Sequence, residues 1–390
     1  MLMHTIHGDM PSAAVDMEPE ALMQQAIQEA RRGLGRTRPN PMVGCVVAQA
    51  GRIIATGYHP KAGQAHAEVV ALNSAGAAAK GADVYITLEP CNHQGRTGRC
   101  TDALIEAGVG RVFVAMEDPN PLVHGRGIER LRQAGIEVHV GIARQQAERL
   151  NEAYSHFIRH NQPWIVAKIA QSLDGKVATR AGVSQWITRE SARAYGHQLR
   201  HAADGIVVGV GTVLGDDPQL TCRISGGADP VRIVLDTWAR TPPTARVVEV
   251  ADKSEAPTWI LVGQQAPQLA CERLRHAGAN VLVVPADDGR IDLRAACGMF
   301  AQKELMSVLV EGGPQVLGSF FDARLVHRLH AFIAPIIIGG RGARSSVEGE
   351  GADLLSEALS LTELEVEHCG PDLWVSGQVG ASAAELREQD

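Results

Sequence analysis

The segment Thr87–Cys100 reads T-L-E-P-C-N-H-Q-G-R-T-G-R-C, and the interpretation of the first part of the chain depends on it. It places Cys91 and Cys100 nine positions apart, which is compatible with a disulfide, a metal site or two unrelated buried thiols. The chain has seven cysteines, and its first residues show neither the basic start nor the apolar run of an export signal. Reduced thiols in a cytoplasm are therefore expected, which argues against the disulfide.

A metal site gains support from H-A-E at His66–Glu68, which precedes an apolar helical stretch. One imidazole and two thiolates supply three zinc ligands and leave a fourth tetrahedral position for water. Zinc lowers the pKa of such a water to about 7, and Glu68 could then move the proton to a departing amine. The pattern H-x-E followed by P-C-x-x-C is typical of zinc deaminases, and here the H-x-E and the Pro-Cys are present but the second cysteine is farther away.

Two blander interpretations of these residues stay open. H-x-E alone is a common tripeptide, and two cysteines this far apart are more often unrelated than co-ligands. A purely structural zinc would need a fourth protein ligand, and His93 could supply it. The gap between the cysteines requires the segment 92–99 to bulge outward, and its His93, Arg96 and Arg99 suit contact with a phosphate.

Length and charge limit the classes of protein that the chain can represent. A chain of 390 residues with 45% hydrophobic content indicates two domains, each with its own core. The formal net charge of −7 argues against a general nucleic-acid binder, which would be basic. No stretch approaches the roughly 20 apolar residues of a membrane span.

Hydrophobic periodicity predicts an α/β layer of about 150 residues in the first part of the chain. Strands at Met42–Val47 and Arg52–Gly57 are expected to form a hairpin around Gly51. The other expected elements are helices at Glu20–Arg32, at Ala67–Ala71 and from Thr101, and strands at Asp83–Leu88, Arg111–Met116 and Ile136–Val140. Gln145–Asn161 has a helical pattern, and Pro163 ends it, so the domain boundary is placed there.

A second, mostly parallel α/β domain is expected beyond this boundary. Its strands are predicted at Trp164–Ala170, Gly205–Val208, Val231–Leu235, Thr258–Val262, Val281–Val284, Ser307–Val310 and Ala331–Ile338. Glycine-rich segments at Gly209–Pro218 and Glu311–Ser319 follow two of these strands, and two such loops suggest a dinucleotide site. The spacing of the first does not fit the Rossmann fingerprint, so that fold is rejected. The tail after Ser376 is expected to be frayed and solvated.

Both halves of the chain resemble one known family. N-P-M-V-G at Asn40–Gly44, H-A-E and the opening segment are similar to the deaminase half of the bifunctional riboflavin-biosynthesis enzymes, diaminohydroxyphosphoribosylaminopyrimidine deaminase/5-amino-6-(5-phosphoribosylamino)uracil reductase. K-I-A-Q-S-L-D-G-K at Lys168–Lys176, S-Q-W-I-T at Ser184–Thr188 and the two glycine loops resemble the reductase half. The resemblance implies an α/β protein with a cytidine-deaminase-like three-layer domain over residues 18–150 and a dihydrofolate-reductase-like domain over residues 162–378.

The resemblance also implies roles for individual residues. In the deaminase it implies zinc on His66, Cys91 and Cys100, with Glu68 as proton shuttle and Asn40, His59 and His93 in the substrate pocket. In the reductase, the positions that match NADPH contacts are Ala170, Trp186, Thr212, Asp216, Thr237, Gly313, Pro314, Gln315, Val316, Leu317, Gly318 and Ser319. The positions that match substrate contacts are Ser184, Arg200, Leu220, Arg223 and Glu311. Lys168 and Asp174 are further candidates near the reacting sugar carbon, with a structural ion pair as the alternative.

Two positions depart from the family pattern. Gly98-Arg99 stands where the family usually has two prolines before the second cysteine, which loosens the loop and adds a charge. Val183 stands where the family often has glutamate before Ser-Gln-Trp. Both departures bear on substrate contacts and leave the expected metal ligands untouched.

The function expected from the resemblance is two consecutive steps of riboflavin synthesis. Zinc-dependent hydrolysis removes the 2-amino group of 2,5-diamino-6-(5-phosphoribosylamino)pyrimidin-4-one, and NADPH then reduces the ribosyl chain to ribityl. A cytoplasmic homo-oligomer without nucleic-acid or membrane partners is expected. The alternatives are a tRNA or nucleoside deaminase with an accessory domain, and a non-enzymatic zinc module with a closed four-ligand site.

Overall fold

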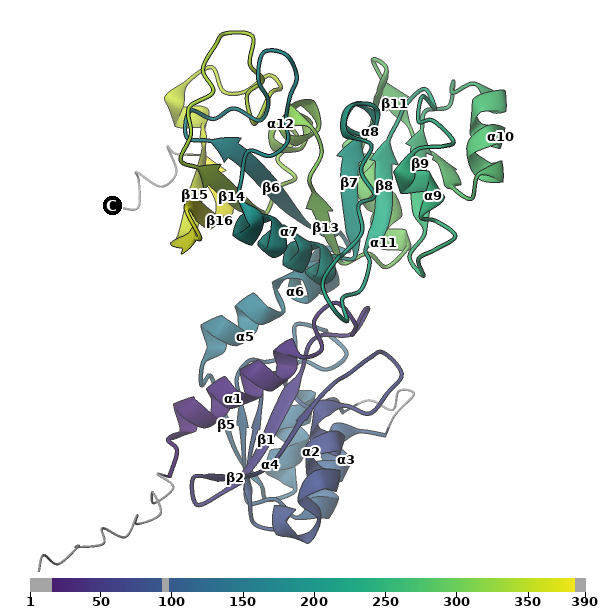
Figure 1. Ribbon diagram of the computed structural model, residues 1–390. Helices are drawn as coiled ribbons and strands as arrows, with labels where there is room; N and C mark the ends of the chain where they lie inside the picture. The colour runs from purple at the N-terminus through teal and green to yellow at the C-terminus, as the bar shows by residue number, and fades with distance from the viewer. Residues whose placement is uncertain (1–15, 93–97, 383–390) are drawn as a thin grey trace, which may run out of the picture. The chain divides into compact units, whose positions relative to one another are not determined.

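The computed structural model describes residues 16–92 and 98–382, which fold as two compact units divided between Ser155 and His156 (Figure 1). The first unit contains a five-stranded sheet and the second a nine-stranded sheet. Helix α6 (Glu152–His160) spans the division. Within the described residues, none of the helices has the length and apolar character that a membrane span requires.

The sheet of the first unit has the strand order β2-β1-β3-β4-β5. Its strands are β1 (Gly44–Gln49), β2 (Arg52–Tyr58), β3 (Asp83–Ile86), β4 (Arg111–Val114) and β5 (Glu137–Val140). Strand β1 pairs antiparallel with β2 and β3, whereas β3, β4 and β5 run parallel. The helices are α1 (Pro19–Arg31), α2 (Ala67–Ala75), α3 (Cys100–Ala107), α4 (Arg126–Gln133) and α5 (Arg144–Leu150). The expected hairpin and the alternation of helices and strands are confirmed.

Two glycines show how helices cover both faces of this sheet. A Cβ on Gly44 would lie 1.9 Å from the carbonyl oxygen of Ala26 in α1, and one on Gly57 would lie 2.4 Å from that of Ala67 in α2. Gly57 pairs with Cys45, the neighbour of Gly44, and successive residues of a strand face opposite sides. Helices α1 and α2 therefore pack on opposite faces, which gives the three expected layers.

The prediction of a single helix over Gln145–Asn161 is wrong. The structure has two helices there, α5 and α6, separated at Asn151. The Asn151 amide is engaged with the backbone of Met42: its Oδ1 accepts from the Met42 N–H at 2.9 Å and its Nδ2 donates to the Met42 carbonyl at 2.9 Å. Asn151 is buried, and this pair of long-range hydrogen bonds satisfies its side chain where the helix is interrupted.

The sheet of the second unit has the order β10-β9-β8-β7-β13-β6-β14-β16-β15. All neighbours from β10 to β14 pair parallel, and the last three strands pair antiparallel, so the mostly parallel sheet is confirmed. The strands are β6 (Trp164–Ser172), β7 (Gly205–Gly209), β8 (Val231–Leu235), β9 (Thr258–Val262), β10 (Asn280–Val283), β13 (Ser307–Val310), β14 (Arg328–Ala334), β15 (Leu359–Cys369) and β16 (Asp372–Ser382). A small hairpin of β11 (Ala286–Asp287) and β12 (Arg290–Ile291) lies outside this sheet.

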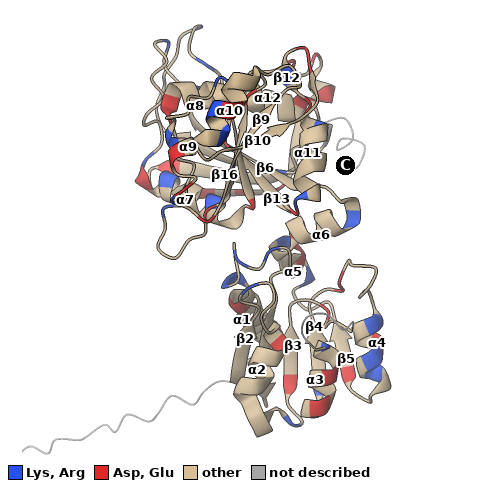
Figure 2. Cartoon of the chain, turned by 90° about the vertical axis from the view of Figure 1, so that its right-hand side faces the viewer, with Lys and Arg blue, Asp and Glu red and all other residues tan. Residues whose placement is uncertain are grey.

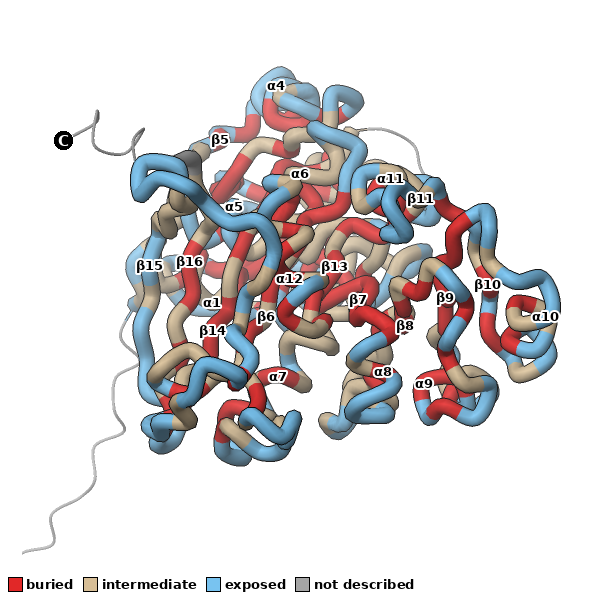
Figure 3. The backbone as a smooth tube through the Cα atoms, turned by 90° about the horizontal axis from the view of Figure 1, so that it is seen from above, coloured by how far each residue is buried: buried red, intermediate tan, exposed pale blue. Residues whose placement is uncertain are grey.

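Helices cover both faces of the large sheet as well. They are α7 (Glu190–Ala202), α8 (Val210–Asp216), α9 (Arg246–Glu249), α10 (Gln268–His276), α11 (Leu293–Gln302) and α12 (Pro314–Asp322). Side chains of α11 and α12 share a core with Val207 and Ile233, whereas those of α9 and α10 share one with the alternate strand residues Ile206 and Val234. The strands β7 and β8 are accordingly buried, red in Figure 3, and Figure 2 shows basic residues gathered on α4.

The expectation of a frayed tail after Ser376 is wrong for residues 377–382, and the rest of that tail lies outside the described residues. Strand β16 continues to Ser382, where it lies between β14 and β15, with Val379 opposite Leu361. The segment G-Q-V-G-A-S lacks the alternation of large apolar residues that marks a strand, because small residues suffice between two neighbouring strands; a Cβ on Gly377 would lie 3.0 Å from the Cβ of Leu361. The strand expected over Ala331–Ile338 also ends earlier, at Ala334, before Pro335.

Candidate functional site

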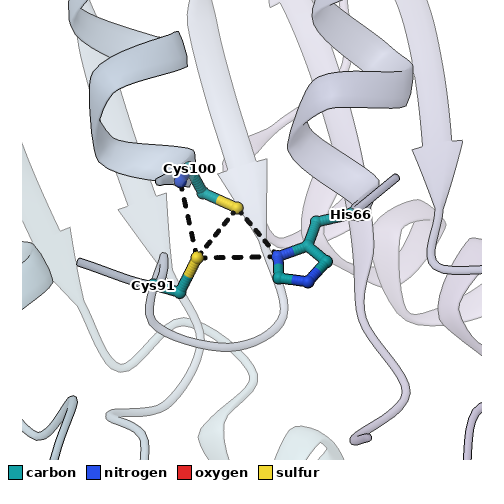
Figure 4. A group of neighbouring side chains, drawn as sticks. All are labelled: His66, Cys91 and Cys100. Atoms are coloured by element: carbon teal, nitrogen blue, oxygen red, sulfur yellow. Dashed lines mark hydrogen bonds between the residues drawn. The ribbon is translucent and has the colours of Figure 1, made fainter. Parts of the chain in front are cut away.

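The side chains of His66, Cys91 and Cys100 converge in the first unit (Figure 4). His66 immediately precedes α2, Cys91 lies in the loop after β3, and Cys100 is the first residue of α3. The two sulfur atoms are 3.3 Å apart, and His66 Nδ1 lies 3.1 Å from Cys100 Sγ and 3.6 Å from Cys91 Sγ. Residues 34 positions apart in sequence are thus brought to one point by the starts of two helices and the end of a strand.

This donor set fits a zinc ion. Bond lengths of about 2.3 Å to sulfur and about 2.0 Å to nitrogen place the ligand atoms of a tetrahedral zinc about 3.5–3.8 Å apart, within about half an ångström of the separations observed. Hydrogen bonding with Cys100 lowers the pKa of Cys91, with a further contribution from His66, and in return raises the pKa of Cys100. The backbone N–H of Cys100 also donates to Cys91 Sγ at 3.4 Å, so one thiolate is stabilised before any cation binds.

Glu68 lies in the first turn of α2 beside these ligands and is buried, with 3% of its surface exposed. Burial raises the pKa of Glu68 to about 7, and the negative charge of Cys91 adds to the shift. A carboxyl group in this position can hold and release a proton near neutral pH, which is what a proton shuttle requires.

Where the structure describes them, the pocket residues implied by the resemblance lie next to the expected metal ligands. Asn40 Nδ2 lies 3.0 Å from His59 Nε2, and His59 Nδ1 lies 3.1 Å from the carbonyl oxygen of Ala65. The His59 and His66 rings meet edge to face at 5.2 Å. Burial lowers the pKa of His59, which keeps its ring neutral and able to accept from Asn40. His93 and Arg96 fall outside the described residues.

The second unit contains a cavity of about 1060 Å³ at the carboxyl ends of its parallel strands. The two glycine loops predicted from the sequence meet there, because β7 and β13 are neighbours in the sheet. A Cβ on Gly312 would lie 3.3 Å from the backbone nitrogen of Gly209, and one on Gly313 would lie 3.4 Å from Thr212 Oγ1. Such close approach of two backbones beside the start of α12, whose first turn no side chain caps, suits the pyrophosphate of a dinucleotide.

Most of the residues expected to bind NADPH or substrate line this cavity. They are Lys168, Ala170, Ser184, Trp186, Arg200, Thr212, Asp216, Leu220, Arg223, Thr237, Glu311, Gly313, Pro314, Gln315, Val316, Leu317 and Ser319. Two are placed elsewhere. A Cβ on Gly318 would lie 1.6 Å from the carbonyl oxygen of Glu348, so that glycine permits a backbone contact. The Asp174 carboxylate accepts from Ser172 Oγ and from the N–H groups of Ile338 and Gly339, which are structural contacts.

The cavity is strongly basic, although the chain as a whole is acidic. Seven arginines and one lysine line it, against the carboxylates of Asp216 and Glu311. Arg200 forms a two-pronged ion pair with Glu311, at 2.8 and 2.9 Å, and Lys168 Nζ lies 3.9 Å from the same carboxylate. Burial opposes ionisation of Glu311, but the charges of Arg200 and Lys168 outweigh it and lower its pKa to about 2. The charge of Arg200 is therefore already balanced.

Arg223 has a different environment. Its Nε donates to Nε2 of His197 at 3.2 Å, and among the described residues no carboxylate lies within ion-pair distance of it or of Arg246. Arg200, Arg223 and Arg246 all line the cavity. Burial lowers the pKa of Arg223, and the positive charges of Arg200 and Arg246 lower it further. Sequence reasoning missed both His197 and Arg246. His197 precedes Arg200 by three residues on one face of α7, a spacing that could have revealed it, whereas the sequence holds no signal for Arg246.

Comparisons with known proteins cover both units. A family described as the cytidine and deoxycytidylate deaminase zinc-binding region matches residues 17–116, and the RibD C-terminal domain matches residues 163–375. The riboflavin biosynthesis protein RibD of Bacillus amyloliquefaciens is 45% identical over 355 residues, 91% of this chain and 94% of that protein. The Escherichia coli RibD is 40% identical over 370 residues, 92% of this chain and 98% of that protein.

Solved structures give the same result. The Acinetobacter baumannii RibD is similar with a TM-score of 0.82 at 35% identity, covering 93% of this chain and 98% of that one. A diaminohydroxyphosphoribosylaminopyrimidine deaminase/5-amino-6-(5-phosphoribosylamino)uracil reductase from Thermotoga maritima is similar with a TM-score of 0.81 at 33% identity, with the same coverage.

Proposed function

Because the chain belongs to the RibD family of riboflavin biosynthesis, we propose how its own residues divide the two reactions of that family between its two units. The protein is a bifunctional enzyme, a zinc-dependent deaminase and an NADPH-dependent reductase. An accessory domain on a tRNA or nucleoside deaminase is not favoured, because the similarity to RibD proteins extends over nine-tenths of the chain. The observation that carries the deaminase assignment is the convergence of His66, Cys91 and Cys100 beside the buried Glu68.

In the first unit, we assign zinc to His66, Cys91 and Cys100. When bound there, zinc supplies a hydroxide from water near neutral pH. Glu68 takes the proton that this water gives up and delivers it to the 2-amino group of the diaminopyrimidine, which leaves as ammonia while the ring carbon gains oxygen. Asn40 and His59, joined by their hydrogen bond, orient the pyrimidine ring.

In the second unit, NADPH supplies the hydride that reduces the ribosyl chain to ribityl. The loops at Gly209–Thr212 and Gly312–Gln315 hold the pyrophosphate of the cofactor against backbone N–H groups. The substrate occupies the part of the cavity around Lys168, Arg200 and Glu311. Since Glu311 balances the charge of Arg200, Arg223 and Arg246 bind the phosphate of the substrate. Their guanidinium groups have no carboxylate partner among the described residues.

We also propose the domain boundaries, the location and the oligomeric state of the protein. We place the deaminase domain at 18–150 and the reductase domain at 162–378, which the two family matches and the division after Ser155 support. We further propose a cytoplasmic homo-oligomer. The terminal strand β15 of the large sheet exposes Leu364 and Val366 by 57% each, and an exposed apolar edge strand favours association. Light scattering on the purified protein tests the oligomer.

The decisive experiment is Glu68→Gln in the full chain. The variant should retain zinc, lose ammonia release by a factor of about 10² or more and still oxidise NADPH with the deaminated intermediate. Glu29→Gln is the matched control, since Glu29 is a second buried glutamate of the same unit, paired with Arg32 and remote in sequence from every ligand. Normal ammonia release by Glu68→Gln would show that the proton shuttle is assigned to the wrong residue.

A further inference from the structure

Glu89 stands two residues before the expected metal ligand Cys91, but its carboxylate bonds to backbone groups of other segments. Its Oε2 accepts from the N–H groups of Asp118 at 3.2 Å and Gly125 at 2.9 Å. Its Oε1 accepts from those of Gly127 at 2.9 Å and Ile128 at 3.3 Å. Only 3% of Glu89 is exposed, so these four bonds replace the water that a carboxylate would otherwise bind.

The four donors include the open end of a helix. Gly127 and Ile128 lie in the first turn of α4, where backbone N–H groups have no partner within the helix. The residue before this helix, Gly125, has no side chain to cap it. Glu89 therefore caps α4 from another part of the chain, and its negative charge meets the positive end of the helix dipole.

The residues on either side of Cys91 also contact the start of α4. A Cβ on Gly127 would lie 2.1 Å from the carbonyl oxygen of Pro90, so glycine is needed for this close approach. Asn92 Nδ2 donates to the carbonyl oxygen of Arg126 at 3.3 Å, and Asn92 Oδ1 accepts from Thr101 Oγ1 at 3.1 Å. Glu89, Pro90 and Asn92 thus hold the segment that contains Cys91 between the starts of α4 and α3, and α3 begins with the other cysteine ligand.

We propose that Glu89 is a positioning residue that fixes the Cys91 thiolate in the metal site, with the start of α4 as the fixed support. The inference rests on the zinc assignment in the proposed function. The residues that orient a metal ligand typically change metal affinity about 10- to 100-fold when they are substituted. A ligand carried by a loop needs such support more than one at the start of a helix, and of the three Cys91 is the one that neither begins nor directly precedes a helix.

The test is Glu89→Gln in the full chain. Glutamine preserves the length of the side chain but turns an NH₂ group toward one of the two pairs of N–H donors. Competition with a chelator should show zinc affinity reduced about 10- to 100-fold. In the cobalt-substituted protein, the thiolate-to-cobalt absorption should shift or weaken, because one cysteine is no longer held at its ligating position. NADPH oxidation with the deaminated intermediate should be unchanged.

Asp204→Asn is the matched control. Asp204 is also buried, and its carboxylate accepts from the backbone N–H groups of Met306 and Ser307 at 2.6 and 2.8 Å, but it lies in the second unit. This variant should lose stability and keep the zinc affinity and the cobalt spectrum of the natural protein. If Glu89→Gln behaves in the same way, Glu89 is merely structural and the inference is overturned.

Gly127→Ala provides a second, independent variant if Glu89→Gln does not fold. It keeps the carboxylate and displaces the Pro90 segment, so zinc affinity should again fall. A folded Gly127→Ala protein with unchanged zinc affinity would also overturn the inference. Failure of the proposed function is distinguishable, because the natural protein itself would then bind no zinc at His66, Cys91 and Cys100.

Discussion

Arg200 and Arg223 line the same cavity and carry the same charge, yet their partners differ. Arg200 is held by the Glu311 carboxylate through two short hydrogen bonds, whereas within the described part of the chain the Arg223 side chain bonds the neutral ring of His197 and no carboxylate. Burial lowers the pKa of His197 to about 4, and the charges of Arg200 and Arg223 contribute, so the ring accepts from Arg223 at neutral pH. A phosphate dianion would therefore gain more from Arg223 than from Arg200.

Replacement of Arg223 or Arg246 by glutamine should weaken binding of the phosphorylated substrate. Loss of a hydrogen bond to a charged group costs about 1.5–3 kcal/mol, so the KM of the reductase should rise about 10- to 100-fold while kcat changes little. Steady-state kinetics on the deaminated intermediate measure the change, and NADPH affinity is followed by tryptophan fluorescence.

The control for this prediction is Arg275→Gln, on the exposed surface of α10. Arg200→Gln should behave differently from the variants at Arg223, Arg246 and Arg275. It leaves the buried Glu311 without its main partner, so its main effect should be a loss of stability and not a change in KM. If NADPH affinity falls in the Arg223 and Arg246 variants while KM for the substrate is unchanged, these arginines serve a phosphate of the cofactor.

At the scale of the element, β16 joins two other strands through residues that do not look like a strand in the sequence. A chain that ends at Ser376 loses the pairing of Gly377 with Leu329 and of Val379 with Leu361, and the hydrogen bond from the Val379 N–H to the carbonyl oxygen of His327. Because each ladder hydrogen bond contributes about 1 kcal/mol, the free energy of unfolding of the reductase unit should fall by a few kcal/mol.

Urea unfolding followed by tryptophan fluorescence checks this expectation. All five tryptophans lie in the second unit, so the signal reports that unit. A chain that ends at Ser382 and keeps the whole of β16 is the control. Equal urea midpoints for the two shortened chains would show that residues 377–382 add no stability, as expected of a frayed tail.

Helix α6, strand β6 and the residue before β14 meet at a cluster of histidines. His156 of α6 lies 4.2 Å from His327, measured between ring centroids, and His327 stacks on Trp164 of β6 at 4.6 Å. His327 Nδ1 accepts from the N–H of Ile165 at 2.9 Å, which requires an unprotonated nitrogen. Burial lowers the pKa of His327 to about 3 and that of His156 to about 4, and neighbouring histidines add to both shifts.

These shifts predict that the reductase unit loses stability in mild acid. Below the ordinary histidine pKa of 6.5 the unfolded chain binds protons that the folded chain excludes, so the free energy of unfolding falls as the pH drops from 6.5 toward 4. Urea unfolding at pH 7.5, 6 and 5 measures the slope. Glu311 does not interfere, because its lowered pKa matters only below about pH 4.5.

His327→Phe should flatten this slope, since phenylalanine can stack on Trp164 but binds no proton. It should also lower stability at pH 7.5, because the Ile165 N–H loses its acceptor. His276→Gln, at an exposed position of α10, should leave the slope unchanged. A slope for His327→Phe equal to that of the natural protein would contradict the role of this cluster.

The elements that the sequence predicts correctly are those whose pattern follows from burial alone. Strands β7, β8 and β9 are runs of β-branched and apolar residues because helices cover both of their faces. Strand β15 was not predicted, since its residues alternate irregularly and most are partly exposed at the edge of the sheet. The interruption at Asn151 depends on a contact with Met42, which lies 109 positions away and leaves no local signal.

The candidate sites divide in the same way. The proposed metal ligands and Glu68 could be named from the sequence because zinc chemistry demands particular residue types near each other, and the structure brings the three donor side chains together. The ion pair of Arg200 with Glu311, 111 positions apart, and the contact of Gly318 with Glu348 depend on how strands are ordered in the sheet, which the residues alone do not encode locally.

At the scale of the whole molecule, the proposed metal ligands and the proposed cofactor cavity lie in separate units. Removal of zinc with a chelator should therefore abolish ammonia release and leave NADPH oxidation with the deaminated intermediate at its original rate. Restoring zinc should restore ammonia release. The two assays on one metal-free sample measure this, and a parallel loss of NADPH oxidation would show that the reductase unit depends on the metal.

The contrast between the acidic chain and its basic cavity has a consequence for how substrates arrive. A net charge of −7 repels an anionic pyrimidine phosphate at long range, whereas the cationic lining attracts it once it reaches the mouth. Mobile ions screen both effects over a Debye length of about 8 Å at physiological ionic strength. Encounter of the reductase with its substrate is thus governed by the surrounding electrolyte as well as by substrate concentration, and kcat/KM carries that dependence while the hydride-transfer step does not.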